Sequence, residues 1–205
     1  MLALFATVSA VSTPVSAFGV FLPVLSAAFG WSRGAVSVAL SINMVLGGVA
    51  AFAIASVADR RGPRGVLALT VLIGAAGLAL NSQIATLWHF YFAYGVMVGI
   101  GFSSVYVLTT ATVSRWFVEQ RGLALAVVLS GFNLGWLVGG PVAAFVIHGW
   151  GWRVAYVVLG LIVAGIGVPA CLWVRYPERT GSDRGGHPAS AIRAGLMSAI
   201  SSTHA

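Results

Sequence analysis

The densest group of chemically active side chains in this chain is the run Asp59-Arg60-Arg61-Gly62-Pro63-Arg64. Four of its six positions carry a charge, although charged residues make up only 7% of the sequence. A carboxylate among guanidinium groups can form ion pairs and charge-assisted hydrogen bonds with other parts of a protein. Burying such a group at the centre of a bilayer costs roughly 3 kcal/mol or more per charge. Long apolar runs flank the cluster, and Gly62 and Pro63 oppose helix continuation, so we expect a basic turn between two membrane-spanning helices.

The other reactive side chains form no pattern that is typical of catalysis or metal binding. All four acidic residues lie at or beyond the ends of predicted helices, and no two histidines have metal-ligand spacing. Ser130 precedes a glycine, but a nucleophile elbow needs glycine two residues to either side, where this chain has Val128 and Phe132. The single cysteine, Cys171, excludes an intrachain disulfide. We therefore expect no enzyme activity, no metal site and no cofactor.

Six predicted transmembrane helices position the charged cluster. Hydrophobic residues make up 59% of the sequence, and the mean hydropathy of +0.98 is typical of a membrane protein. Since about 20 apolar residues cross the hydrocarbon core, the predicted spans are residues 4–27, 35–57, 66–80, 88–113, 123–147 and 154–174. The fold class is therefore all-α and integral to the membrane. We expect residues 1–175 to form one six-helix bundle and residues 176–205 to form a disordered cytoplasmic tail, like a central loop.

The distribution of arginine predicts how these spans are oriented. All 11 basic residues are arginines, and they lie at the ends of apolar runs. With six spans, nine of them fall on one side of the membrane and two, Arg33 and Arg153, on the other. The positive-inside rule then puts both termini in the cytoplasm. Residues 1–32 carry no charge, so they indicate a span with a missing or very short upstream tail rather than a signal peptide. Scattered arginines at membrane edges do not favour nucleic-acid binding.

Hydroxyl groups are distributed unequally over the six predicted helices. The first helix carries Ser9, Ser12, Thr13 and Ser16, whose spacing places them on one helix face. The fourth carries five hydroxyl-bearing side chains between residues 103 and 110, whereas the third and sixth carry few and are expected to face lipid. We expect helices 1, 2, 4 and 5 to line a polar cavity, with four candidate lining residues: Ser12, Ser16, Tyr106 and Asn133. The alternative is that each hydroxyl bonds a neighbouring helix or its own backbone.

Glycine also recurs at a fixed spacing. Gly131, Gly135 and Gly139 repeat every four residues in the fifth predicted helix, and Gly95 and Gly99 do so in the fourth. Small residues at this spacing let two helix backbones approach closely. We interpret both sets as helix-packing surfaces.

The charged turn resembles the signature loop between the second and third helices of major facilitator superfamily transporters. That loop reads Gly-x-Leu-Ala-Asp-Arg-x-Gly-x-Arg-x-x-Leu. Six positions match, with Ala55 and Val57 in place of the first Gly and the Leu: Ala58, Asp59, Arg60, Gly62, Arg64 and Leu67. The resemblance implies the N-terminal half of a twelve-helix fold, in which six helices form a 3+3 inverted repeat. It also implies that four residues latch the cytoplasmic helix ends across the two halves in the outward-open state: Asp59, Arg60, Gly62 and Arg64.

Other stretches are similar to the monocarboxylate and oxalate/formate exchanger branch of this family. They are residues 18–23 with 29–33, and the loop that begins at Arg115 and continues into the fifth predicted helix. The branch pattern there is Tyr-Phe-x-x-Arg-Arg-x-Leu-Ala, closing on a Gly. Trp116 and Gln120 depart from it, and five residues match: Phe117, Arg121, Leu123, Ala124 and Gly131. The resemblance assigns Arg115 and Arg121 to the cytoplasmic loop between helices 4 and 5.

The family resemblance implies secondary active transport of a small, monocarboxylate-like organic anion across the inner membrane, with a proton or a counter-anion as the coupled ion. Because alternating access needs two halves, the chain would act as half of a transporter or derive from a truncated one. The expected partners are the lipid bilayer, a small-molecule substrate, and a missing second half or another half-transporter. Two alternatives remain open: a drug or sugar carrier of the same fold, and a membrane interaction partner that transports nothing.

Overall fold

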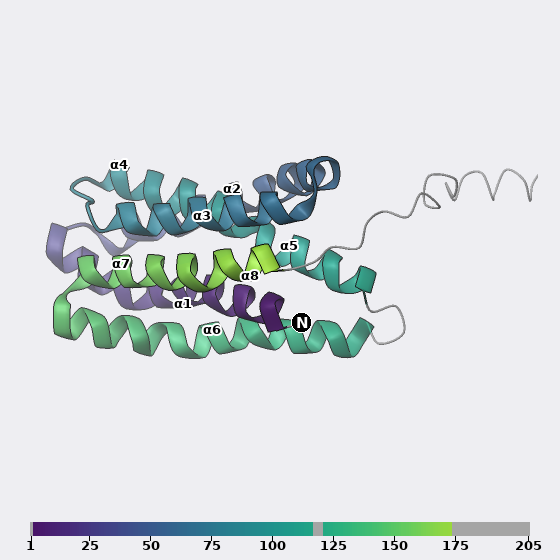
Figure 1. The fold of residues 1–205 in the computed structure, drawn as a ribbon. Coiled ribbons are helices and arrows are strands. Elements are labelled where there is room, and N and C mark those ends of the chain that lie inside the picture. Colours follow the sequence, from purple (N-terminus) through teal and green to yellow (C-terminus); the bar gives the residue numbers. More distant parts are fainter. Residues whose placement is uncertain (1, 117–120, 174–205) are drawn as a thin grey trace, which may run out of the picture.

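The structure, a computed structural model, describes residues 2–116 and 121–173, and for residues 59, 114–116 and 121 it describes the backbone alone. Within these ranges every regular element is helical, and six helical spans are long and apolar enough to cross a membrane. The six predicted spans are therefore confirmed (Figure 1). The predicted tail, residues 176–205, lies outside the described residues.

Four of the spans are single helices: α1 (Leu2–Phe29), α2 (Arg33–Arg61), α3 (Pro63–Asn81) and α6 (Arg121–Trp150). The fourth and sixth spans each contain a π-helical segment, where the wider turn interrupts the regular α-helical ladder. The fourth span consists of α4 (Leu87–Phe90), η1 (Tyr91–Val98) and α5 (Gly99–Trp116). The sixth consists of α7 (Trp152–Ile162), η2 (Val163–Gly167) and α8 (Val168–Trp173).

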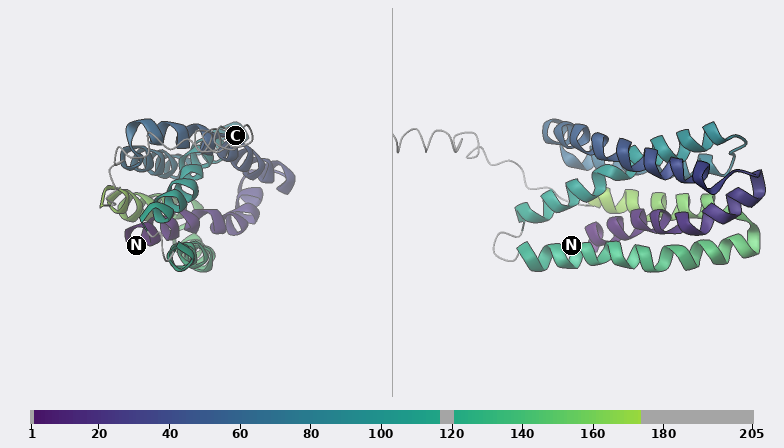
Figure 2. Two further views of the ribbon diagram at one scale, coloured as in Figure 1. Left: turned by 90° about the vertical axis from the view of Figure 1, so that its right-hand side faces the viewer. Right: turned by 180° about the vertical axis from the view of Figure 1, so that it is seen from behind.

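The spans differ in how much of each is covered by the rest of the bundle. In α1 and in the fourth span, 56% of the apolar segment is buried, against 11% in α2 and 28% in α6. The spans predicted to be outermost, α3 and the sixth, have intermediate values of 39% and 44%. They are more covered than expected because they pack against each other, and because α3 also packs against the fourth span and the sixth span against α1. By contrast, α2 packs mainly against the fourth span and α6 mainly against α1, so each leaves a broad face open (Figure 2).

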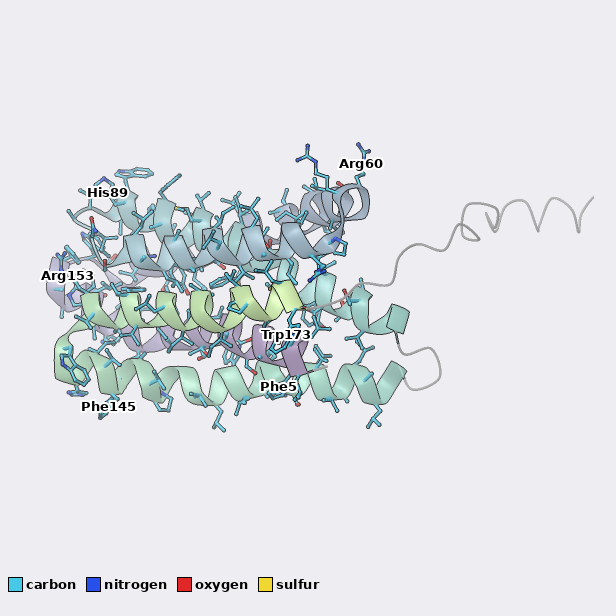
Figure 3. All side chains as sticks on the ribbon, viewed as in Figure 1. Phe5, Arg60, His89, Phe145, Arg153 and Trp173 are labelled. Atoms are coloured by element: carbon cyan, nitrogen blue, oxygen red, sulfur yellow. The ribbon has the colours of Figure 1, made fainter. Side chains whose placement is uncertain are left out.

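The two ends of the bundle carry different side chains. Arg60 lies at one end, and His89 and Arg153 lie at the other (Figure 3). At the His89 end, aromatic rings join the end of α1, the loop that follows it and the start of the sixth span: Phe29 stacks on Trp31 at 4.4 Å, and Trp152 meets Phe29 edge-on at 5.6 Å. Aromatic rings of this kind are typical of membrane interfaces. The arrangement agrees with the predicted alternation, in which successive turns lie at opposite ends.

Candidate functional site

The charged turn is tighter than the sequence suggested. The predicted spans on either side of this turn ended at residue 57 and began at residue 66, but α2 continues to Arg61 and α3 begins at Pro63, so Gly62 alone separates them. The correction has a physical basis: arginines are favourable in a last helical turn, where they face the negative end of the helix dipole. Gly62 ends α2 because its φ of 89° is a conformation that other residues rarely adopt. Pro63 then occupies the first turn of α3, where its missing N–H costs nothing.

The arginines of this turn point in different directions. Arg64 donates a hydrogen bond from its guanidinium to the carbonyl of Leu172 in α8, which ties the start of α3 to the end of the sixth span. Arg60 and Arg61 are exposed in the last turn of α2, and Arg60 extends away from the bundle (Figure 3). The side chain of Asp59 is not among those described. Arg60 and Arg61 thus lie at the surface, while Arg64 has a hydrogen-bond acceptor inside this bundle.

The second predicted charged site, the loop between helices 4 and 5, lies mostly outside the described residues. Arg115 belongs to the last turn of α5 and Arg121 is the first residue of α6. Their side chains are not described, so the roles assigned to Arg115 and Arg121 stay predictions.

The hydroxyl face of α1 lies against the glycine face of α6. Ser9 donates to the carbonyl of Gly131 at 2.9 Å, and Ser16 donates to the carbonyl of Gly135 at 3.3 Å. A Cβ atom at Gly135 would lie 2.4 Å from the carbonyl oxygen of Ser9, so only glycine fits there. The packing interpretation of Gly131, Gly135 and Gly139 is therefore confirmed, while the contacts of Ser9 and Ser16 follow the alternative reading of the α1 hydroxyls, in which they bond a neighbouring helix. The residues of these two faces are called the α1–α6 seam: Ser9, Ser12, Thr13, Ser16, Gly131, Gly135 and Gly139.

Two of the four predicted cavity residues, Ser12 and Ser16, belong to the α1–α6 seam. Ser12 is 3% exposed, and its hydroxyl donates to the carbonyl of Val8, one turn earlier in the same helix. Ser16 is half-buried and also bonds the carbonyl of Thr13. In this conformation the two hydroxyls therefore serve helix packing rather than an open surface, because the glycines of α6 bring its backbone onto them. A role for either in solute binding stays a prediction.

The other two candidates lie on open faces. Tyr106 of α5 is 54% exposed, and Asn133 of α6 is exposed between Phe132 and Leu134. A nearby aromatic pair, Phe132 and Trp136, lies on the same helix with ring centroids 5.8 Å apart. The structure therefore separates the four predicted cavity residues into a packed pair on α1 and an exposed pair on α5 and α6.

Sequence reasoning missed a second polar contact, between α2 and the fourth span. The side-chain amide of Asn43 donates to the carbonyl of Tyr94 at 3.0 Å, inside the π-helical segment η1. Gly95 and Gly99 border this contact: a Cβ at Gly99 would lie 2.9 Å from the carbonyl oxygen of Asn43. These residues, Asn43, Tyr94, Gly95 and Gly99, are called the α2–η1 seam. The glycine spacing pointed to packing, but nothing in the sequence indicates a π-helical segment.

A third polar contact lies between α3 and α5. The hydroxyls of Thr70 and Ser104 are 2.8 Å apart, and both side chains are buried. The lone hydroxyl of the third predicted helix is thus paired inside the bundle.

Comparison with known proteins places these features in a family. The model of the Major Facilitator Superfamily matches residues 4–203. An uncharacterized MFS-type transporter of Bacillus subtilis (strain 168), YcxA, is 31% identical over 155 residues, or 75% of this chain and 38% of the relative. Monocarboxylate transporter 12 of Homo sapiens is 33% identical over 101 residues, or 49% of this chain and 20% of the relative. Monocarboxylate transporter 13 of Rattus norvegicus is 27% identical over 145 residues, or 71% of this chain and 34% of the relative.

The matched region therefore spans between a fifth and two fifths of the length of these curated relatives. The structure has six candidate membrane spans. This is half the number of helices in the twelve-helix fold that the resemblance of the charged turn implies. The family match covers nearly the whole chain and all six spans, with the charged turn in its expected place between the second and third. On this evidence the chain belongs to the Major Facilitator Superfamily.

Proposed function

We propose that this chain forms one half of a secondary active transporter for small, monocarboxylate-like organic anions. The observation that carries the proposal is the similarity to two transporters named for monocarboxylates, at 27–33% identity, in a chain that belongs to a transporter family. Similarity to the branch pattern around Arg121 supports the same substrate class.

In this proposal the charged turn acts as the conformational latch. The single-residue connection at Gly62 fixes the ends of α2 and α3 relative to each other. Arg60 is exposed, where a second half can reach it. Arg64 anchors the turn to the sixth span through Leu172. Asp59 would complete the latch by accepting hydrogen bonds from a facing helix end, since carboxylates are favourable near helix N-termini. Arg115 and Arg121 would lie on the same side of the membrane.

The solute would bind against the open faces of the bundle. Tyr106 offers a hydroxyl donor and Asn133 an amide donor, and both groups can bond a carboxylate. Both are exposed in the structure, so a second half would enclose them with its own residues, including the cation that an anion requires. Ser12 and Ser16 would join the site only if α1 and α6 move apart during transport.

The remaining parts of the proposal concern the setting of the protein. The arginine asymmetry supports both termini on the cytoplasmic side of a cell inner membrane. Coupling would use a proton or a counter-anion. The partner would be a second half, in the same polypeptide or in another half-transporter, because alternating access is a rocking of two halves about a central site.

Solute counterflow tests the proposal. The protein is taken from native membranes together with its partners, reconstituted into vesicles, and loaded in three arms with unlabelled lactate, glucose or a cationic drug. We expect external labelled solute to accumulate only in the lactate arm, and Asn133→Ala to reduce that accumulation by at least severalfold. Accumulation in the glucose or drug arm would replace the anion proposal with the corresponding carrier. Absence of exchange in all arms would favour a membrane interaction partner. A sample proven to be monomeric is expected to show no exchange.

A further inference from the structure

An apolar groove of about 410 Å³ separates α2 from α3 near the charged turn. One wall comes from α2 and the other from α3, and the residues that line it are Ala53, Ile54, Val57, Arg61, Gly62, Gly65, Val66, Leu69 and Thr70. We call this the α2–α3 groove. Thr70 lies at its floor, because its side chain is 4% exposed and bonds Ser104 of α5 behind it. The groove therefore opens away from α5.

One charged side chain lines this otherwise apolar groove. Arg61 is the last residue of α2 and is exposed. Arg60 precedes it and is exposed as well. An arginine that follows a membrane-spanning helix lies at the depth of the lipid headgroups, where it attracts anionic phosphate. The end of the groove next to the charged turn thus carries positive charge, and the side chains that line the rest of the groove are mainly apolar.

We propose that the α2–α3 groove binds an anionic phospholipid, with one acyl chain between α2 and α3 and its phosphate on Arg61. This site goes beyond the transport function and does not depend on it. The acyl chain would contact the apolar walls, and the phosphate oxygens would accept hydrogen bonds from the guanidinium, which suits phosphate geometry.

The composition of the groove favours a lipid over a partner helix. Apart from the Thr70 hydroxyl, which bonds Ser104, the only polar lining side chain is the exposed cation Arg61, and an apolar groove beside a cation suits a hydrocarbon chain with an anionic headgroup. The α3 wall has no side chain at Gly65, and a Cβ built there meets no atom within 4 Å, so this position is open.

A second groove in the bundle provides an internal comparison. It measures about 300 Å³ and lies between α1, α6 and the sixth span. Its lining residues are apolar or hydroxyl-bearing, with no charged side chain among them. It would accept hydrocarbon from any lipid and would not select for anionic headgroups.

Lipid selectivity of the purified chain tests the proposal. The chain is equilibrated in mixed micelles with phosphatidylglycerol and phosphatidylcholine, and the lipids retained are counted by native mass spectrometry. We expect one phosphatidylglycerol to be retained preferentially. Arg61→Gln should weaken its binding about fivefold, the factor that corresponds to roughly 1 kcal/mol per surface cation. Gly65→Leu adds a bulky side chain to the lining of the groove at a position where a Cβ meets no atom within 4 Å, and it should abolish the preference.

Two control variants match these changes elsewhere on α2. Arg33→Gln removes one charge at the opposite end of the same helix. Gly48→Leu adds the same side chain at a glycine whose Cβ also meets no atom within 4 Å. Both should retain the preference within about twofold.

Three results would overturn the proposal. The first is unchanged selectivity in both Arg61→Gln and Gly65→Leu. The second is equal competition by glycerol phosphate alone, which would mean a headgroup site without the groove. The third is a cross-link from the groove to a partner helix in native membranes instead of to a photoactivatable lipid. Should Gly65→Leu fail to fold, Arg61→Gln and the glycerol phosphate arm still decide the question.

Discussion

The α1–α6 seam and the α2–η1 seam join a central span to an outer one by different means. In the α1–α6 seam the glycines belong to the outer helix, and two hydroxyls of the central helix donate to glycine carbonyls. In the α2–η1 seam the glycines belong to the central span, and one amide of the outer helix donates to a carbonyl. Under the inverted repeat of the family the two seams are equivalent pairs, the first span with the fifth and the fourth with the second. Their donors nevertheless differ. Between α2 and η1 the hydrogen bonds run in both directions, because the hydroxyl of Tyr91 in η1 also donates to the carbonyl of Ala35 in α2 at 2.9 Å.

The central spans also differ in their backbones. Helix α1 is α-helical from Leu2 to Phe29, with Pro14 and Pro23 inside it, and the hydroxyls of Ser9 and Ser16 reach across to α6. The fourth span contains η1, whose backbone hydrogen bonds differ from those of an α-helix. At the end of η1 the backbone amide of Gly99 donates to the carbonyl of Val96, three residues earlier in the chain. Continuation of the π-helical pattern would have sent that amide to Tyr94. From α2, the side-chain amide of Asn43 donates to the Tyr94 carbonyl inside η1. The α1–α6 seam is thus joined by hydroxyls of the central span, whereas the α2–η1 seam adds a side-chain amide from the outer helix.

The largest effect is expected from closing the α1–α6 seam. Gly135→Ala places a Cβ 2.4 Å from the carbonyl oxygen of Ser9 and 2.7 Å from the Cβ of Ser12. Backbone atoms cannot move aside as a side chain can, so α1 and α6 must separate. We expect the free energy of unfolding, measured by titrating the detergent-solubilised chain with SDS, to fall by about 3 kcal/mol.

Another glycine of α6, Gly149, provides the control for this change. Apart from its chain neighbours, a Cβ at Gly149 meets no atom within 4 Å, so Gly149→Ala should leave stability unchanged or raise it by up to about 1 kcal/mol through helix propensity. Equal losses in the two variants would show that close backbone approach does not hold the α1–α6 seam.

The sequence predicted the six spans because apolar length is a sufficient signal for a membrane helix. It also predicted the glycine packing, since four-residue spacing places small residues on one face. It did not predict that the Ser12 face would meet the Gly135 face, because the pairing of two helices depends on the whole bundle. Hydroxyls suit a polar cavity and a close helix contact equally well, and only their neighbours distinguish the two.

The predicted end of α2 was wrong for a related reason. Charge marks the edge of the membrane, and it was taken to mark the end of the helix as well. In the structure the helix continues through Arg60 and Arg61 and ends only where Gly62 requires a positive φ. The π-helical segment at Tyr94 had no sequence signal, since neither proline nor a glycine pair is needed to form one.

An intermediate effect is expected from removing the amide of the α2–η1 seam. Asn43→Ala removes the side-chain amide that donates to the carbonyl of Tyr94. We expect a loss of about 1 kcal/mol in the same titration, within the range measured for hydrogen bonds between membrane helices. Hydrogen exchange of the η1 amides should also become faster.

Asn133→Ala is the matched control, because that asparagine is exposed on α6. Its substitution should leave both the stability and the exchange of η1 unchanged. Faster exchange throughout the bundle in Asn43→Ala would indicate general loosening and would contradict a local role in stabilising the π-helical segment.

The smallest effect is expected from single hydroxyls of the α1–α6 seam. Ser9→Ala removes the 2.9 Å bond to Gly131, yet the glycines still hold the two backbones together. We expect a loss of about 0.6 kcal/mol, the average for such bonds in membranes. Ser130→Ala is the control, because that hydroxyl is exposed and bonds only Val127 of its own helix. If Ser9→Ala lowers the free energy of unfolding more than Asn43→Ala does in the same titration, the hydroxyls and not the glycines hold α1 and α6 together. Substitutions at Ser12 and Ser16 would then have to be interpreted as packing defects before any change in transport is assigned to solute binding.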